Sequence, residues 1–379
     1  MRFNFRKKLK YMTSRKKILF FLPQLDPGGA ERVTINIIRL LDKNLFDIHL
    51  ATLNLNGHYL DFIPKEVELH ELNVSKTLFS ILRLRKVIEN IQPDVLFSSL
   101  FRSHIACDMA LIGMKNKPFT VFRSPNSPKL ILKNRQMGPL YKYLLEHAYQ
   151  RANILLAQTP EMKQEIAYYH NIAENKIIIF INPLDIEHIK SNLLNIKNPF
   201  DKNFINIIAS GRLSYQKGFD ILIKAFKPAV EINNKLHLHI IGEDDGEEKN
   251  LKSLVKKLSL EKNVHFLGFQ SNPYKFYYFS DLYILSSRWE GLPNTVLENL
   301  YLNKPIIATK CIPFMANLIS NGKNGLLVDV ENIEQLTKAI LNFKNIRPNR
   351  IKNEKQNEDI NKLFLDFCTG TANCFRGKT

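Results

Sequence analysis

The 379-residue chain is poor in cysteine and has no apolar run long enough to cross a membrane. Its four cysteines, at positions 107, 311, 368 and 374, include no C-x-x-C pair, which argues against a zinc cluster or a disulfide framework and favours a reducing compartment. The most apolar N-terminal run, residues 18–22, ends at Pro23, far short of the roughly 20 residues that a spanning helix needs. No small-residue cleavage site follows it, so a signal peptide is not predicted. The length and the ordinary apolar content predict a cytoplasmic globular protein of two domains.

Acidic residues are absent from two segments, 1–17 and 115–142, although the whole chain carries a net charge of +18. These segments hold eight and seven basic residues, together with apolar side chains such as Phe3, Phe5 and Leu130. A localised basic surface indicates an anionic partner, such as nucleic acid, anionic lipid or a phosphorylated acceptor. The mixture with apolar residues suits a membrane surface, and a merely solubilising basic face is an equally good explanation.

Short apolar runs alternate with amphipathic stretches along most of the chain, a pattern typical of parallel sheets covered by helices on both faces. In the first half, strands are predicted at residues 17–22, 46–53, 95–98, 119–122, 154–157 and 177–180. In the second half, strands are predicted at residues 204–209, 236–241, 264–267, 282–285 and 305–308. The fold class is therefore α/β, with two doubly wound units. Ligands of such sheets bind beyond the carboxyl ends of the strands.

The pattern also predicts where the domains begin and end. Residues 1–182 form a first Rossmann-like domain with a basic N-terminal segment, and residues 183–203, which contain prolines and asparagines, form a linker. Residues 204–345 form a second Rossmann-like domain. Residues 346–379 form a C-terminal tail, in which residues 360–367 are a candidate short helix.

A first candidate motif, Pro-Gly-Gly-Ala-Glu-Arg at residues 27–32, follows the first predicted strand and opens a helix. Gly28 and Gly29 allow a ligand to approach the backbone closely, and the helix start offers N–H groups to an anion. The spacing is not G-x-G-x-x-G, so a dinucleotide fingerprint is not supported. A simple tight turn explains the motif equally well.

A second candidate motif, residues 211–218, follows the first strand of the second domain. Gly211 opens the turn, and the cations Arg212 and Lys217 lie five residues apart at the expected ligand-binding edge of the sheet. Arginine binds phosphate through two parallel hydrogen bonds and lysine acts as a point charge. The motif therefore indicates an anionic ligand, with a solvated surface loop as the alternative.

The third candidate motif, residues 290–298, places Glu290 before a predicted helix and Glu298 in its second turn. Pro293 suits the first helical position. Because helical side chains lean toward the N-terminus, Glu298 points back toward Glu290. Two carboxylates suit pairs of sugar or ribose hydroxyls, and N–H groups around Asn294 and Thr295 suit a phosphate.

These three segments, in this order, resemble the retaining nucleotide-sugar glycosyltransferases of family 4, over about residues 16–330. The E-x7-E spacing from Glu290 to Glu298 is the most specific element of the resemblance. Asn182-Pro183 resembles the hinge of the family, residues 241–243 and 267–269 resemble the strand ends that flank the nucleotide base, and residues 324–328 resemble its closing segment. The resemblance implies the GT-B architecture, in which two Rossmann-like domains face one another across a cleft.

The resemblance also implies a role for each site residue. Arg212 and Lys217 would neutralise the departing diphosphate, Glu290 would face the donor sugar, and Glu298 would bind the ribose. The implied catalytic residues are Glu290, Arg212 and Lys217. The implied donor-binding residues are Gly28, Gly29, Gly211, Arg212, Lys217, Gly242, Phe269, Asn294, Thr295 and Glu298. Ser99 and His104 are candidates for the sugar or acceptor side, with a surface or core position as the alternative for His104.

The predicted reaction moves a hexose or N-acetylhexosamine from a nucleotide sugar, with UDP favoured by the resemblance, to a membrane-associated glycan with retention of configuration. The predicted acceptor is a lipid-linked or lipopolysaccharide-type glycan, and the predicted location is the cytoplasm, with peripheral attachment to the inner face of the plasma membrane. The chain has no D-x-D motif, and neither a metal nor another cofactor is expected.

Three alternatives remain open from the sequence. One is a sugar-nucleotide epimerase or hydrolase of the same fold. A second is an inactive member of the family, because Phe314-Met315-Ala316-Asn317 stands where the family has a glycine-rich loop that ends in glutamate. The third is a nucleic-acid-binding protein, which is disfavoured because no nucleic-acid motif is present and the basic segments lie outside the half that carries the motifs.

Overall fold

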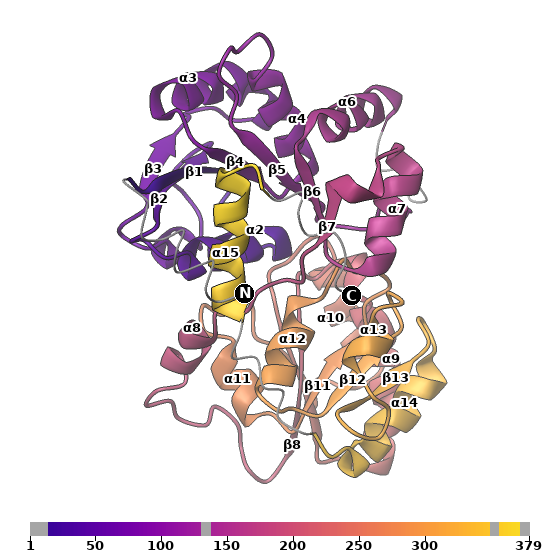
Figure 1. The fold of residues 1–379 in the computed structure, drawn as a ribbon. Coiled ribbons are helices and arrows are strands. Elements are labelled where there is room, and N and C mark those ends of the chain that lie inside the picture. Colours follow the sequence, from indigo (N-terminus) through magenta and orange to yellow (C-terminus); the bar gives the residue numbers. More distant parts are fainter. Residues whose placement is uncertain (1–13, 130–137, 349–355, 372–379) are drawn as a thin grey trace. The chain divides into compact units, whose positions relative to one another are not determined.

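The computed structural model describes residues 14–129, 138–348 and 356–371. The chain divides into two compact units (Figure 1). Unit 1 comprises residues 1–183 and 354–379, and unit 2 comprises residues 184–353. Each unit contains one parallel sheet, and both sheets begin with the strand order third-second-first-fourth-fifth-sixth that defines a doubly wound fold. The predicted fold class is therefore confirmed.

The sheet of unit 1 has the strand order β3-β2-β1-β4-β5-β6-β7, with every pair parallel. Its strands are β1 (Lys16–Phe21), β2 (Phe46–Thr52), β3 (Glu68–Glu71), β4 (Val95–Ser98), β5 (Phe119–Arg123), β6 (Ile154–Ala157) and β7 (Ile177–Ile179). Successive residues of β1 point to opposite faces, so that Ile18 and Phe20 enter one core while Leu19 and Phe21 enter the other. Both faces of the strand are apolar because both are covered.

Helices cover the two faces of this sheet. They are α2 (Gly29–Leu40), α3 (Ile81–Ile91), α4 (Phe101–Ala110), α6 (Pro139–Arg151), α7 (Pro160–His170) and α15 (Gln356–Cys368). Helix α2 packs on one face and contributes Val33 and Ile37, whereas α3 and α4 contribute Ile88 and Ala106 to the other. Because all strands of this sheet are parallel, their carboxyl ends lie at one edge of the unit, where the glycine motif of residues 27–32 also lies.

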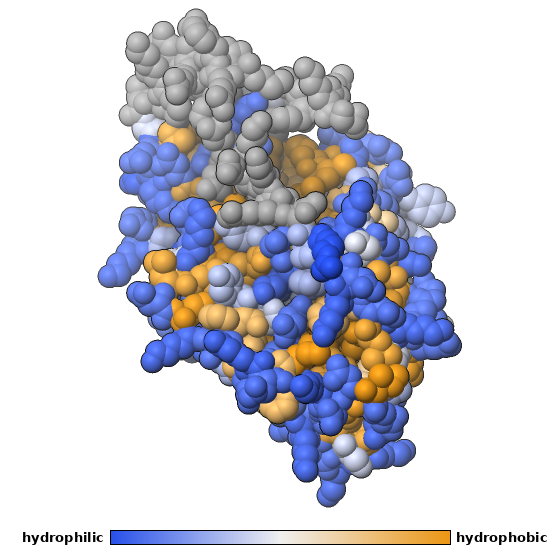
Figure 2. Space-filling view, turned by 90° about the horizontal axis from the view of Figure 1, so that it is seen from below, coloured by the Kyte–Doolittle hydropathy of each residue, from blue (hydrophilic) through white to orange (hydrophobic). Residues whose placement is uncertain are grey.

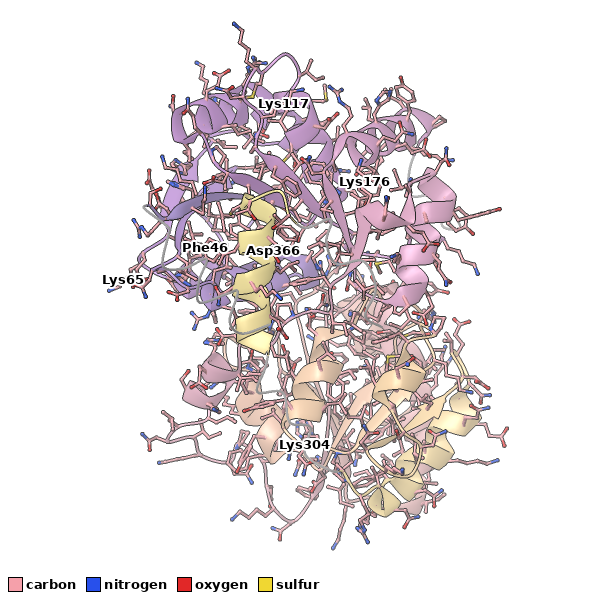
Figure 3. All side chains as sticks on the ribbon, viewed as in Figure 1. Phe46, Lys65, Lys117, Lys176, Lys304 and Asp366 are labelled. Carbon is pink, nitrogen blue, oxygen red and sulfur yellow. The ribbon has the colours of Figure 1, made fainter. Side chains whose placement is uncertain are left out.

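The C-terminal segment corrects the sequence-based prediction, because residues 356–368 form a full helix of unit 1 rather than part of a separate tail. Helix α15 packs beside α2, as Figure 1 shows for the yellow helix next to the indigo strands; Asp366 marks it in Figure 3. Phe364 and Phe367 are fully buried, and the Phe364 ring lies 5.9 Å from that of Phe97. The candidate short helix at residues 360–367 lies within α15, which is longer than expected because apolar positions are interleaved with charged ones along it.

The sheet of unit 2 has the order β10-β9-β8-β11-β12-β13, again with every pair parallel. Its strands are β8 (Ile205–Ser210), β9 (Leu236–Ile241), β10 (Val264–Phe266), β11 (Leu282–Leu285), β12 (Ile306–Thr309) and β13 (Gly325–Val328). Its helices are α8 (Ile186–Ser191), α9 (Phe219–Ile232), α10 (Glu248–Lys257), α11 (Tyr274–Phe279), α12 (Asn294–Tyr301), α13 (Met315–Leu318) and α14 (Ile333–Asn342). Two apolar clusters flank the sheet, with Ile207 in one and Ile208 in the other.

Three other details differ from the sequence-based prediction. The predicted linker, residues 183–203, contains α8, and all of it after Pro183 belongs to unit 2. The strands β3 and β13 were not predicted. Strand β3 carries glutamate at both ends and a histidine within it, so it lacks the apolar run of a buried strand. It lies at the edge of its sheet, where polar strands are common.

The membrane-directed predictions fall partly outside the described residues. Phe3, Phe5 and most of the first basic segment lie there, as does Leu130 with the centre of the second segment. Within the described residues, no helix combines the length and the apolar character needed to traverse a bilayer. The face drawn in Figure 2 shows hydrophilic side chains interspersed with hydrophobic patches.

Candidate active site

The second sheet changes direction between β8 and β11, and the loops that follow these two neighbouring strands carry the most closely coupled pair of predicted site residues. The Nζ atom of Lys217 lies 2.6 Å from the Oε1 atom of Glu290. The Ser287 hydroxyl donates to the same oxygen at 2.7 Å, and Glu290 is only 7% exposed. In an open doubly wound sheet, ligands bind beyond the carboxyl ends of the strands at such a switch point. The structure therefore brings two of the three predicted catalytic residues together at the expected place.

Arg288, which the sequence analysis missed, holds these two loops together. Its guanidinium binds Asp220 at 2.9 Å and Glu331 at 2.7 Å, and it lies 3.8 Å from the centre of the Tyr215 ring. The Ser286 hydroxyl adds a bond of 2.9 Å to the carbonyl of Lys217. No motif identifies Arg288, because its partners are distant in sequence. The clamp fixes the backbone that presents both Lys217 and Glu290.

Cys311 lies close enough to this pair for Glu290 and Lys217 to affect it electrostatically, and its buried thiol favours the protonated form. Burial raises the pKa of the Cys311 thiol to about 12, and the negative charge of Glu290 adds to the shift. The thiol is therefore neutral at pH 7, whereas the reactive form of cysteine is the thiolate.

The glycines predicted near the donor allow the loops after β8, β9 and β10 to pack tightly. A Cβ atom on Gly242 would lie 1.8 Å from the carbonyl oxygen of Gly211, and Gly242 has a φ of +157°. Its N–H donates at 3.0 Å to the carbonyl of Gly268, which precedes Phe269. Gly211, Gly242 and Phe269 thus come after three adjacent strands, β8, β9 and β10, along one edge of the sheet.

Helix α12 follows the Glu290 loop and begins one residue later than predicted, at Asn294, with Pro293 as its N-cap. The Tyr283 hydroxyl donates to the Thr295 hydroxyl at 2.6 Å, which fixes the first turn. Burial raises the pKa of Tyr283, and the charges of Glu290 and Glu298 raise it further. Both glutamates of the motif therefore lie within electrostatic reach of this phenol, and Glu298 is only 1% exposed.

Arg212 is not part of this cluster. Its side chain is half exposed and lies 3.5 Å from Asp245. The neighbouring Asp244, part of the nearest approach to a D-x-D motif, accepts the backbone N–H groups of residues 246–248 at 2.9–3.0 Å. That carboxylate is therefore engaged in holding the loop before α10.

In unit 1, the residues predicted from the first motif lie at the carboxyl edge of the sheet. Gly28 is the N-cap of α2, and a Cβ atom there would lie 2.1 Å from the Glu31 carboxylate, which folds back over it. Gly29 is the first residue of the helix. Ser99 follows β4 directly, and its hydroxyl lies 2.9 Å from that of Thr34 on α2.

His104 does not fit the sugar-side role. Its ring is fully buried within α4 and stacks on Phe122 at 4.8 Å between centroids and 11° between planes. Burial lowers the pKa of His104 to about 3, so the imidazole is neutral at pH 7. The alternative of a core position therefore explains this residue better.

Arg123, at the end of β5, is a buried charge that the sequence analysis did not single out. It is 2% exposed and donates to the Oδ1 atom of Asn182, the residue of the predicted hinge dipeptide. Its Nε and Nη1 atoms make no hydrogen bond to any described residue. Burial lowers the pKa of Arg123 to about 9, and the charge of Glu31 opposes the shift.

The segment from Phe314 to Asn317 lies at helix α13, where the family resemblance called for a glycine-rich loop. Met315 is fully buried and Phe314 is 9% exposed, so both side chains enter the core of unit 2. These four residues include no glutamate, and the side chains of Phe314 and Met315 pack into the apolar core instead.

Two family models match this chain. The model "Glycosyl transferases group 1" matches residues 192–360, and the model "Glycosyltransferase Family 4" matches residues 27–188. The chain is a glycosyltransferase of the GT-B type. The first model therefore covers most of unit 2 of this glycosyltransferase, and the second covers most of unit 1.

Three curated relatives show how far the similarity extends. A glycosyltransferase of Methanocaldococcus jannaschii is 35% identical over 257 residues, which cover 62% of this chain and 60% of that protein. One from Haemophilus influenzae is 29% identical over 86% of this chain and 89% of the relative. The Campylobacter jejuni N-acetylgalactosamine-N,N'-diacetylbacillosaminyl-diphospho-undecaprenol 4-alpha-N-acetylgalactosaminyltransferase is 28% identical over 84% of this chain and 87% of that enzyme.

Solved structures agree on the fold. Anabaena HepE, in complex with UDP and glucose, superposes with a TM-score of 0.74 at 18% identity, covering 94% of this chain and 100% of that one. WaaG, a glycosyltransferase involved in lipopolysaccharide biosynthesis, superposes with a TM-score of 0.66 at 16% identity, covering 95% and 96%.

Proposed function

We propose that this glycosyltransferase moves a hexose or N-acetylhexosamine, with retention of configuration, from a UDP-sugar to a glycan carried by a membrane lipid. The observation that carries the proposal is the Lys217–Glu290 pair at the switch point of unit 2, 2.6 Å apart and followed by the start of α12. The cation and the start of the helix suit the diphosphate of a nucleotide sugar, and the carboxylate suits its sugar.

In the proposed reaction, each of these groups stabilises a charge that develops as the bond to the sugar breaks. Breaking the bond between sugar C1 and the diphosphate builds negative charge on the phosphate and positive charge at C1. The Lys217 ammonium and the first N–H groups of α12 stabilise the negative charge, and the Glu290 carboxylate faces the positive side. Lys217 contacts Glu290 before the donor arrives, so the bound diphosphate shares this ammonium with the carboxylate.

The remaining groups bind the donor rather than act on the bond. Glu298, near the same Tyr283 hydroxyl, accepts hydrogen bonds from the ribose, because an ionised carboxylate is an acceptor only. The backbone of Gly211 and Gly242, where the two loops approach each other closely, is proposed to contact the base and the phosphates. Arg212 is half exposed, and we propose that it turns from Asp245 to the diphosphate when the donor binds.

The acceptor proposal rests on the named relatives. The Campylobacter enzyme is named for a diphospho-undecaprenol acceptor, and a second relative from that organism is named for a longer glycan on the same lipid.

Peripheral contact with the membrane accords with the basic segments and with Leu140 and Tyr143 on α6, which are 71% and 57% exposed. A flotation assay with anionic vesicles checks this: removal of residues 2–15 reduces association if this segment attaches the protein.

The decisive experiment is a panel of UDP-, GDP- and ADP-sugars with polyprenyl-diphosphate-linked acceptors and the purified chain. We expect UDP release that depends on the acceptor and a product whose anomeric configuration, read by NMR, matches that of the donor. Donor breakdown that is independent of the acceptor would instead indicate the epimerase or hydrolase alternative. No turnover of any donor would favour the inactive alternative raised by Phe314–Asn317.

A further inference from the structure

Three metal-ligating side chains gather at the edge of the sheet in unit 1, far in sequence from the motifs of unit 2. In the parallel β2–β3 pair, His49 is opposite Glu68 and Ala51 is opposite His70. Since alternate residues of a strand share a face, His49, Glu68 and His70 project from the same side of the pair. Phe46 and Lys65, labelled in Figure 3, mark the start of β2 and the loop that leads to β3.

The distances among these side chains match those in a tetrahedral metal site. The Nδ1 atom of His49 lies 3.1 Å from the Nε2 atom of His70 and 3.5 Å from the Oε2 atom of Glu68. The His70 Nε2 atom lies 3.7 Å from the other Glu68 oxygen. Ligands about 2.0–2.1 Å from a tetrahedral zinc ion are about 3.3 Å apart, so little movement is needed to bind one.

A further carboxylate is placed to orient the first histidine. His49 is 5% exposed, and its Nε2 atom makes no hydrogen bond to any described residue. The Oδ2 atom of Asp47 lies 3.5 Å from it. Histidines that bind a metal through one ring nitrogen usually donate the other N–H to a carboxylate, and Asp47 is positioned to accept it.

A second histidine pair provides an internal comparison. In β9–β10, the Nδ1 atom of His237 lies 3.0 Å from the Nε2 atom of His265, which is an ordinary hydrogen bond between rings. Among the described residues, however, only His49, Glu68 and His70 form a group of at least three ligands with metal-site spacing. Both sites contain a pair of histidines, and Glu68 is the residue that distinguishes the β2–β3 site from the β9–β10 site.

We propose that His49, Glu68 and His70 bind one zinc ion, with water in the fourth position. Two imidazoles and one carboxylate suit zinc, whereas calcium and magnesium prefer oxygen ligands throughout. The ion joins β3, the polar edge strand, to β2, and so it stabilises this edge of the sheet. This site belongs to unit 1 and is independent of the sugar-transfer chemistry proposed for unit 2.

The test uses the full chain, purified without a histidine tag and stripped of metal. Zinc is titrated into wild type, His70→Gln, Glu68→Gln and the matched control His265→Gln, with calorimetry for affinity and elemental analysis for stoichiometry. We expect one tightly bound zinc per wild-type chain, a loss of affinity of at least about tenfold in both unit 1 variants, and wild-type binding in His265→Gln. Cobalt in place of zinc should give the strong visible absorption of tetrahedral coordination.

Circular dichroism of the metal-free variants separates a lost site from a lost fold. A rise in melting temperature upon zinc addition should occur in wild type and in His265→Gln but not in folded His70→Gln. The proposal is overturned if the wild-type chain binds no zinc, if His70→Gln keeps wild-type affinity and stoichiometry, or if His265→Gln loses as much zinc as His70→Gln.

Discussion

The ammonium of Lys217 lies 2.6 Å from a carboxylate oxygen of Glu290, although 73 positions separate the two residues in the chain. The strand order of unit 2 makes this contact possible, because β8 and β11 are neighbours in the sheet and the loops after them meet at one edge. Without substrate, the two charges neutralise each other. With a sugar diphosphate bound, we expect the Lys217 ammonium to act on the diphosphate and the Glu290 carboxylate to act on the sugar.

Removing either member of this pair should abolish most of the activity while the fold survives. We expect Lys217→Met and Glu290→Gln each to lower kcat about 10²–10³-fold, the usual cost of losing one preorganised charge that acts on the transition state. The measurement is steady-state transfer with the best donor of the panel. Lys224→Met, which breaks an exposed i,i+4 pair with Asp220 in the same unit, is the matched control and should keep wild-type turnover.

The loops at the edge of the sheet should tolerate no side chain at Gly242. A Cβ atom there would overlap the Gly211 carbonyl, so Gly242→Ala should displace the loop after β8 and weaken donor binding in calorimetry by at least about tenfold, equivalent to about 1.4 kcal/mol. Gly246→Ala is the control, because Gly246 also has a positive φ, +93°, but open space around its Cβ position. If both variants bind the donor equally, the close approach has no role in the site.

Acid should destabilise unit 1 through His104. The pKa of this histidine is about 3 in the folded state and 6.5 in an unfolded chain, because burial disfavours the charged ring. As the pH falls below about 6.5 the unfolded state binds the proton first, so the free energy of unfolding declines by up to about 1.4 kcal/mol per pH unit until the pH reaches about 3. Denaturant unfolding at pH 7 and pH 5 should therefore show a smaller loss in His104→Phe than in wild type. Equal losses would mean that the ring is solvated.

Arg123 should contribute little net stability despite its full burial. Its desolvation is costly, and a similarly sized apolar side chain avoids that cost. We expect Arg123→Met to unfold within about 1 kcal/mol of wild type at pH 7, whereas Arg123→Ala, which leaves a cavity, should lose about 2–4 kcal/mol. A drop as large in the methionine variant as in the alanine variant would show that the hydrogen bond to Asn182 dominates.

Helix α15 should be essential to the first sheet. Phe364 is fully buried against Phe20 and Phe97, so Phe364→Ala should lower the free energy of unfolding by about 3–5 kcal/mol. Hydrogen exchange should then show faster opening of β1 and β4, the strands beneath it. Tyr168→Ala, which removes a ring that is 81% exposed, is the control and should leave exchange unchanged.

The sequence predicted the alternation of strands and helices because buried parallel strands, such as β1 and β8, must be apolar on both faces. It also predicted that Lys217 and Glu290 lie in loops that follow recognisable strands, β8 and β11. It did not predict β3, whose exposed edge position requires no apolar run. Of α15 it predicted only residues 360–367 as a candidate short helix, because the apolar face of this helix is recognisable only against its partner. Arg288 and Arg123 were not identified as site residues, because their roles arise from burial and from partners distant in the chain.

The order of synthesis imposes a constraint on folding. Unit 1 comprises residues 1–183 and 354–379, and all of unit 2 lies between these two segments in the sequence. Domains generally fold as they leave the ribosome, the N-terminal one first. Here unit 1 cannot bury Phe20 and Phe97 under Phe364 until residue 364 has been synthesised, which is after all of unit 2. Unit 2 is therefore free to reach its native state before unit 1 does.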